Sequence, residues 1–96
     1  MARRRYVITY DISDDKRRSK VFNVLEGNGD HVQFSVFVCS LNEFEVVQLK
    51  LDLVPLIDHA KDQVLFIDLG SAEGAADKKV EALGLPYIEP CRVIVV

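Results

Sequence analysis

A chain of 96 residues has room for one hydrophobic core, so we expect a single domain over residues 1–96. Its 49% hydrophobic and 28% charged residues are typical of a globular protein and argue against a disordered one. No apolar run approaches the roughly 20 residues that cross a bilayer, and the apolar segment after residues 1–5 is too short for a signal peptide. These observations predict a cytoplasmic protein that does not enter a membrane.

The net charge of −3 is unevenly spread along the chain. Residues 1–20 hold seven basic and three acidic side chains, a balance of +4 that leaves −7 for the other 76 residues. Such a distribution can place a basic, nucleic-acid-binding face on an acidic protein. The alternative is a solvated helix surface, and charge alone favours that alternative.

The first half of the chain predicts a strand, a helix and a second extended segment. Residues 5–10 are β-branched and aromatic, as strands are. Ser13 or Asp14 can cap the helix that follows, and apolar residues recur at helical spacing up to about Glu26. Gly-Asn-Gly-Asp at residues 27–30 predicts the end of this helix.

The second half predicts another helix and further strands. Residues 31–41 form one bent strand or two short ones; Asn42 then caps a helix that Pro55 ends or kinks near Leu53. The remaining predicted elements are a strand at 63–69, a small-residue loop at 70–77, a short strand or helical turn at 79–83, and a terminal strand at 92–96.

This order of elements predicts an α+β ferredoxin-like sandwich, with helices on one face and an extra C-terminal strand. The fold hosts many functions and does not by itself indicate a chemistry. Cys39 and Cys91 match no zinc-binding spacing, so we expect two reduced and largely buried thiols.

Asp11 directly follows the first predicted strand, where a rigid scaffold can hold a metal ligand in an open site. One carboxylate is a poor magnesium site. Two carboxylates from a symmetric dimer, completed by water and phosphate oxygens, make a reasonable one. The alternative is that Asp11 caps the following helix, and the residues alone favour that alternative.

Arg17 and Arg18 can hold phosphates through their planar guanidinium groups, or they can lie on a solvated helix surface. Asp14 and Asp15 suit the positive end of the helix dipole. The two histidines are isolated, and we do not expect either to bind a metal. The sequence shows no Ser–His–Asp set and no glycine-rich phosphate loop, which argues against the common hydrolases and nucleotide-dependent enzymes.

Two segments resemble a known family. Residues 6–18, Tyr-Val-Ile-Thr-Tyr-Asp-Ile-Ser-Asp-Asp-Lys-Arg-Arg, resemble the opening of CRISPR-associated protein 2. Residues 29–37, Gly-Asp-His-Val-Gln-Phe-Ser-Val-Phe, are similar to the Gly-x-x-Val-Gln-x-Ser-Val-Phe strand of the same family. The spacing between the two segments also fits. The C-terminal half matches only in the order of its elements and at residues 80–84.

The resemblance implies a homodimer of ferredoxin-like domains, with Mg²⁺ or another divalent metal held between two copies of Asp11. It implies that a nuclease site would comprise Tyr10, Asp11, Arg18 and Phe37. We expect nucleic acid to contact Lys16, Arg17, Arg18, Lys20 and His31. His31 stands where many members of the family carry Arg, which weakens the expected phosphate contacts at a nuclease site.

Three functions remain open from the sequence. The first is a subunit of CRISPR spacer acquisition that bridges integrase dimers and supports a double-stranded DNA prespacer through salt-dependent, sequence-tolerant phosphate contacts. The second is a metal-dependent endonuclease that acts on RNA or DNA. The third is a ferredoxin-like regulatory or toxin-type nucleic-acid-binding module unrelated to CRISPR. We expect the first as the biological role.

Overall fold

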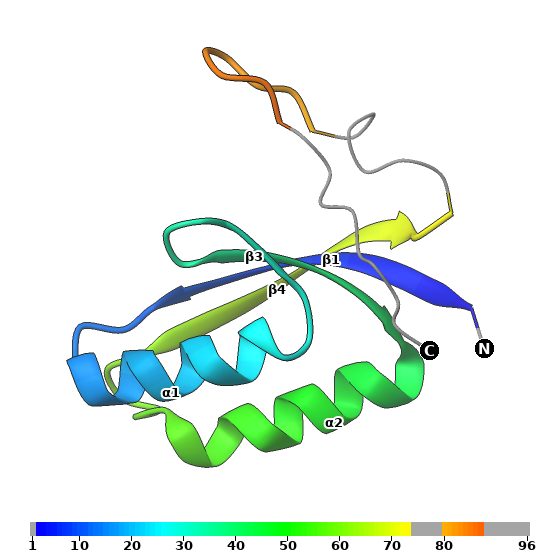
Figure 1. Cartoon of the computed structure of the whole chain (residues 1–96). Coiled ribbons are helices and arrows are strands. Elements are labelled where there is room, and N and C mark those ends of the chain that lie inside the picture. The colour runs from blue at the N-terminus through cyan, green and yellow to red at the C-terminus, as the bar shows by residue number, and fades with distance from the viewer. Residues whose placement is uncertain (1, 74–79, 88–96) are drawn as a thin grey trace.

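The structure is a computed structural model that describes residues 2–73 and 80–87. Its elements are β1 (Arg3–Asp11), α1 (Asp15–Glu26), β2 (Asp30–Gln33), β3 (Val36–Asn42), α2 (Glu43–Leu53), the short 3-10 helix η1 (Val54–Leu56) and β4 (Gln63–Ser71). The strands form one antiparallel sheet in the order β2-β3-β1-β4, and both α-helices cover the same face (Figure 1). This arrangement confirms the predicted ferredoxin-like α+β fold. The terminal strand predicted at 92–96 lies outside the described residues.

The hydrophobic core lies between the sheet and the two helices. Successive residues of a strand face opposite sides of a sheet, so Ile8 and Tyr10 of β1 are buried under the helices while Val7 and Thr9 face the other way. The core comprises Ile8, Tyr10, Ile12, Val21, Leu25, Phe37, Cys39, Leu41, Val46, Leu49 and Leu53. Burial of the residues on both sides of Asp11 fixes the backbone from which that carboxylate projects.

The helix ends agree with the capping residues predicted from the sequence. The Asp14 carboxylate accepts a hydrogen bond of 2.9 Å from the backbone N–H of Arg17, so Asp14 caps α1. Asn42 and Glu45 bond each other's backbone N–H groups in a capping box at the start of α2. This helix ends at Leu53, before the proline of η1, as predicted.

The structure answers one open question and corrects two boundaries. Residues 31–41 contain most of two strands, β2 and β3, joined by a turn at Phe34 and Ser35. Gly70 and Ser71 extend β4 instead of starting a loop, because Ser71 pairs with Arg4 of β1 beyond a shift in register, and Gly70 can adopt the φ of 94° found at that shift. The prediction of a strand or helical turn at 79–83 was wrong for residues 80–83, which form neither; the fully exposed side chain of Leu83 packs on no core that would hold such an element. Cys39 is buried, as expected; Cys91 lies outside the described residues.

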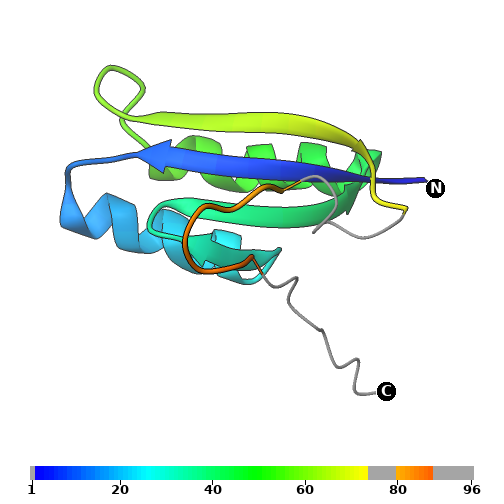
Figure 2. The ribbon, with the colours of Figure 1, turned by 90° about the horizontal axis from the view of Figure 1, so that it is seen from above.

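The sheet face away from the helices is partly open. Leu65 and Ile67 of β4 are 46% and 45% exposed on it, and Val7, Val36 and Val38 are half-buried nearby. Residues 80–87 lie over part of this face (Figure 2). We call the surface formed by these five apolar side chains the open face. Within residues 2–73 and 80–87, no helix is long and apolar enough to span a membrane.

Gly29 lies where α1 is followed by β2 and allows a close approach to β3. A Cβ atom at Gly29 would collide with Sγ of Cys39 and would lie 2.7 Å from the carbonyl oxygen of Val38. We therefore expect Gly29→Ala to lower the free energy of unfolding by about 1–3 kcal/mol. Gly27→Ala is the matched control, because its Cβ would meet no atom closer than 3.5 Å and its φ of −73° suits alanine. Equal losses in urea unfolding of the two variants would contradict the close approach at Gly29.

Candidate metal and nucleic-acid site

Asp11 ends the central strand β1 and projects into solvent. Its backbone pairs with Gln63 of β4, and by strand alternation its side chain belongs to the same face as Val7 and Thr9. The alternative that Asp11 caps α1 was wrong, because Asp14 occupies the cap position. Asp11 is therefore available as a ligand on the side of the sheet that carries the open face.

A metal at Asp11 needs ligands from outside one chain. Among the residues that the structure describes, no group of three or more His, Cys, Asp or Glu side chains could hold a metal ion. Mg²⁺ prefers six oxygen ligands, and it commonly keeps several waters while binding one or two carboxylates and phosphate oxygens. The exposed carboxylate of Asp11 fits this chemistry when a second copy, water and nucleic acid supply the other oxygens.

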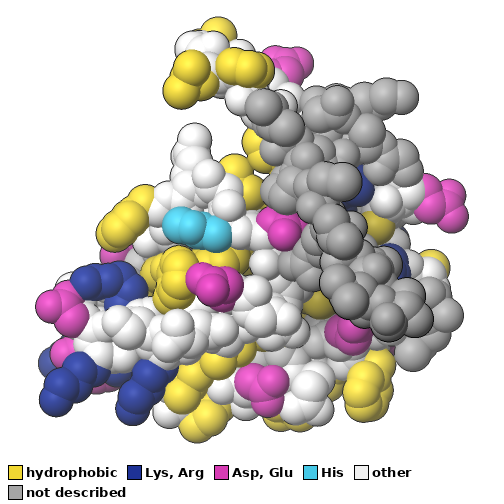
Figure 3. All heavy atoms as spheres, in the orientation of Figure 1, with side chains coloured by type: hydrophobic (Ala, Val, Ile, Leu, Met, Phe, Trp, Pro, Cys, Tyr) yellow, Lys and Arg dark blue, Asp and Glu magenta, His cyan; other side chains and the backbone are white. Residues whose placement is uncertain are grey.

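Lys16 and Lys20 are basic side chains of α1, the helix that follows Asp11 in the chain. They are exposed one turn apart on α1, and Lys and Arg side chains gather over the N-terminal half of that helix (Figure 3). The N-terminal arginines are placed differently: Arg3 is ion-paired with Glu45 at 2.7 Å and Arg4 with Asp68 at 2.8 Å. The excess positive charge of residues 1–20 is therefore divided between two ends of β1.

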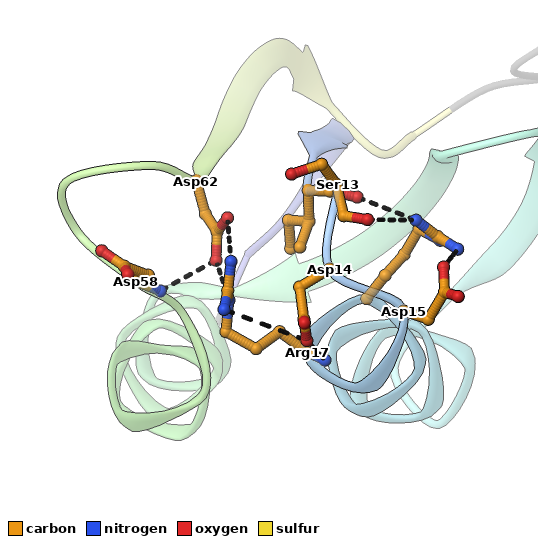
Figure 4. Close-up of polar contacts among 8 residues, drawn as sticks. Ser13, Asp14, Asp15, Arg17, Asp58 and Asp62 are labelled. Carbon is orange, nitrogen blue, oxygen red and sulfur yellow. Dashed lines mark hydrogen bonds and ion pairs between the residues drawn. The ribbon is translucent and has the colours of Figure 1, made fainter.

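Arg18 is held against the turn that joins β1 to α1. Its Nη1 donates to the carbonyl oxygens of Ile12 at 3.1 Å and Ser13 at 3.2 Å, and its Nη2 bonds the carboxylate of Asp15 (Figure 4). The Asp15 side chain is 88% exposed, so an incoming phosphate has a solvated partner to displace. This geometry fixes the Arg18 guanidinium against the two residues that directly follow Asp11 in the chain.

Arg17 points to the other side of α1 and is already engaged. Its Nε and Nη2 donate to the two carboxylate oxygens of Asp62 at 2.7 and 3.1 Å, and the Asp62 side chain is fully buried (Figure 4). Asp62 also accepts a 2.8 Å bond from the backbone N–H of Asp58. The hydrogen bonds from Arg17 hold the pKa of the Asp62 carboxyl below its ordinary value. Arg17 thus ties α1 to the loop before β4, and its planar group has little left for phosphate.

Tyr10 and Phe37 lie within the core beside this turn. Tyr10 is 8% exposed and stacks on Phe37 with 6.4 Å between ring centroids. Phe37 is completely buried and also packs against Phe22 and His31, with centroids at 5.4 and 4.9 Å. Phe37 can therefore affect a substrate only by positioning Tyr10 and His31.

A cavity of about 290 Å³ lies between α1 and the hairpin of β2 and β3. Its lining combines aromatic rings, small polar groups and one arginine: Tyr10, Arg18, Ser19, Phe22, Asn23, His31, Phe34 and Ser35. We call it the hairpin cavity. The sequence did not predict it, because its walls come from segments that only the fold brings together.

Comparison with known proteins places this geometry in a family. The family model described as "CRISPR associated protein Cas2" matches residues 4–75, a range that includes all eight predicted site residues. The chain belongs to the Cas2 family. This result confirms the resemblance seen in the sequence and does not favour a regulatory or toxin-type module unrelated to CRISPR.

Curated and solved members of the Cas2 family agree over most of the chain. The chain is 45% identical over 82 residues to "CRISPR-associated endoribonuclease Cas2 1" of Rhodospirillum rubrum, covering 85% of this chain and 79% of that protein. It is 33% identical over 82 residues to the "CRISPR-associated endoribonuclease Cas2" of Geobacter sulfurreducens, covering 85% of each. Among solved structures, Streptococcus pyogenes Cas2 at pH 6.5 has a TM-score of 0.69 at 32% identity, covering 83% of this chain and 99% of that one. A hypothetical protein from Thermus thermophilus has a TM-score of 0.76 at 35% identity, covering 90% and 96%.

Proposed function

We propose that this Cas2 family chain acts as a cytoplasmic homodimer in CRISPR spacer acquisition, where it bridges integrase dimers and supports a double-stranded prespacer. The observation that carries the proposal is the family match over residues 4–75. That range includes nearly all of the described sheet, both α-helices and the turn that holds Asp11 and Arg18.

The open face supports the homodimer. Leu65 and Ile67 are exposed apolar residues on it, and a second copy would remove them from water. Asp11 belongs to the same side of the sheet, so stacking two open faces brings two copies of its carboxylate toward each other. A divalent cation such as Mg²⁺ would supply the charge that neutralises this pair and any phosphate beside it.

The outer surface of α1 supports duplex binding. Lys16 and Lys20 are exposed, and a dimer presents each of them twice. Ammonium groups at the surface bind phosphate through charge, with no base readout, so the binding should tolerate any sequence and weaken with salt. Arg18 adds a planar donor once phosphate replaces Asp15.

A second candidate function is a metal-dependent endonuclease on RNA or DNA. It is favoured by the endoribonuclease names of the relatives from Rhodospirillum rubrum and Geobacter sulfurreducens. Here Asp11 would hold the metal, which activates water and stabilises charge on the phosphate. Arg18 would orient the same phosphate, and Tyr10, at the end of the buried strand, would keep Asp11 in place.

Reconstituted spacer integration tests the proposed function. The assay combines the purified chain, the integrase of the same genome, a prespacer duplex and repeat DNA. We expect integration to require the chain and the complex to contain it as a dimer. Lys16→Ala combined with Lys20→Ala should flatten the salt dependence of duplex binding by about one unit for each phosphate that the lysines no longer neutralise. Integration by the integrase alone at the same rate, or a monomeric mass at about tens of micromolar, would overturn the proposal.

A further inference from the structure

We propose that the hairpin cavity binds one unpaired nucleobase, adjacent to the duplex that the dimer supports. This inference rests on the proposed function, because it takes nucleic acid as the ligand. The cavity of about 290 Å³ is at the small end of ligand-binding pockets and suits a single base, whereas a base pair would not enter it.

Aromatic side chains supply the surfaces on which a base can stack. Phe34 is 84% exposed at the turn of the hairpin, although a side chain of this size is usually buried. Phe22 and His31 also line the cavity and make an edge-to-face contact with centroids 5.1 Å apart. Stacking on such rings works for every base, because each base has a π-face. The cavity therefore fits a sequence-tolerant partner.

The turn that carries Phe34 is anchored next to Asp11. The carbonyl oxygen of Ser35 accepts a 3.2 Å hydrogen bond from the backbone N–H of Tyr10. Ser35 has a φ of 63°, a conformation that non-glycine residues adopt at a cost and that is frequent at functional sites. The aromatic ring of Phe34 is thus presented from a backbone tied to the central strand.

Polar groups at the cavity match the rest of a nucleotide. Ser19 and Asn23 of α1 line it and offer donors and acceptors for the edge of a base. Arg18 lines the same cavity and lies against the turn after Asp11, where the phosphate of a bound nucleotide would reach. Hydrophobic and basic side chains lie side by side at this end of the molecule (Figure 3). Stacking surface, base-edge partners and a phosphate donor are therefore combined in one place.

Binding of two DNA probes tests this inference. One probe is a blunt duplex, and the other is the same duplex with a short single-stranded extension whose first base is 2-aminopurine; both are measured in EDTA to prevent cleavage. We expect the extension to tighten binding about tenfold and to quench the 2-aminopurine fluorescence. Phe34→Ala should remove both effects and leave blunt-duplex affinity unchanged. Phe44→Ala is the matched control, because Phe44 is 67% exposed on α2 and does not line the cavity.

The outcomes separate this inference from the proposed function. An extension that adds no affinity, or a Phe34→Ala variant that weakens both probes equally, overturns the base site while duplex support stands. If the chain binds the extension as a free single strand but does not bind the blunt duplex, the base site stands and the proposal of duplex support is overturned. Because Phe34 is exposed, the variant should keep the melting temperature of the parent chain; if it does not, Asn23→Ala on α1 takes its place and must remove the same advantage.

Discussion

Replacing Asp11 with asparagine should lower metal-dependent cleavage by about 100-fold or more while the chain remains a folded dimer. Asparagine keeps the size of the side chain and removes the negative charge that would bind the cation. Two copies of Asp11 that face each other repel in the absence of a cation, so a divalent metal should stabilise the wild-type dimer and not the variant. Nuclease assays and thermal melts with and without Mg²⁺ measure both effects.

The same variant separates a scaffold from an enzyme. We expect Asp11→Asn to support reconstituted integration, because the core and the exposed lysines of α1 are unchanged. Glu26→Gln is the matched control, since it removes another exposed carboxylate, at the far end of α1, and should cleave normally. Loss of integration by a folded, complexed Asp11→Asn dimer would show that the carboxylate chemistry is the function. Normal cleavage by this variant would remove Asp11 from the site.

Replacing Arg17 with alanine should lower the melting temperature by about 10 °C or more. The reason is the fully buried side chain of Asp62, which would keep its charge without either guanidinium hydrogen bond. Lys16→Ala is the matched control, because it removes the same charge from an exposed position of α1 and should change the melting temperature little. A similar decrease in both variants would contradict the buried pair.

The pair also predicts a dependence on pH. Arg17 lowers the pKa of Asp62 below its ordinary value in the folded chain. The stabilisation from this carboxylate is therefore complete above the ordinary pKa of an aspartate, about pH 4, and is lost as the pH falls through the folded pKa. The difference in stability between the wild type and Asp62→Asn should therefore narrow below about pH 4. A difference that stays constant with pH would show that the carboxylate is not held as an ion.

Loss of DNA binding by Arg17→Ala would accordingly report on folding before it reports on phosphate contact.

The sequence predicted the parts of the site that depend on local patterns. Strand alternation and the capping residues placed Asp11 at the end of a buried strand and Arg18 on the first turns of a helix. The family resemblance supplied the metal-binding role that we propose for Asp11, which residue types alone did not favour. Predictions from such local and family patterns do not require knowledge of distant contacts.

The rest depends on contacts that the sequence does not display. Arg17 meets Asp62 across 45 positions in the chain, so nothing near Arg17 indicates that its planar group is occupied. The turn at Phe34 and Ser35 lacks the Gly, Asn, Asp or Pro that usually marks a hairpin, which is why one bent strand could not be distinguished from two. The homodimer and the terminal strand at 92–96 stay predictions.

The position of β1 gives the two proposed sites different resistance to local opening. β1 lies between β3 and β4, whereas β2 is an edge strand bonded only to β3 within the part of the chain that the structure describes. Amide hydrogen exchange generally reports that edges open at lower free energy than the centre of a sheet. Opening of β2 would separate the residues that line the hairpin cavity, whereas Asp11 would stay in place on β1. The chain would then bind an unpaired base only while the hairpin of β2 and β3 is closed. The Asp11 carboxylate would stay in position on β1 even while β2 is open and base binding is interrupted.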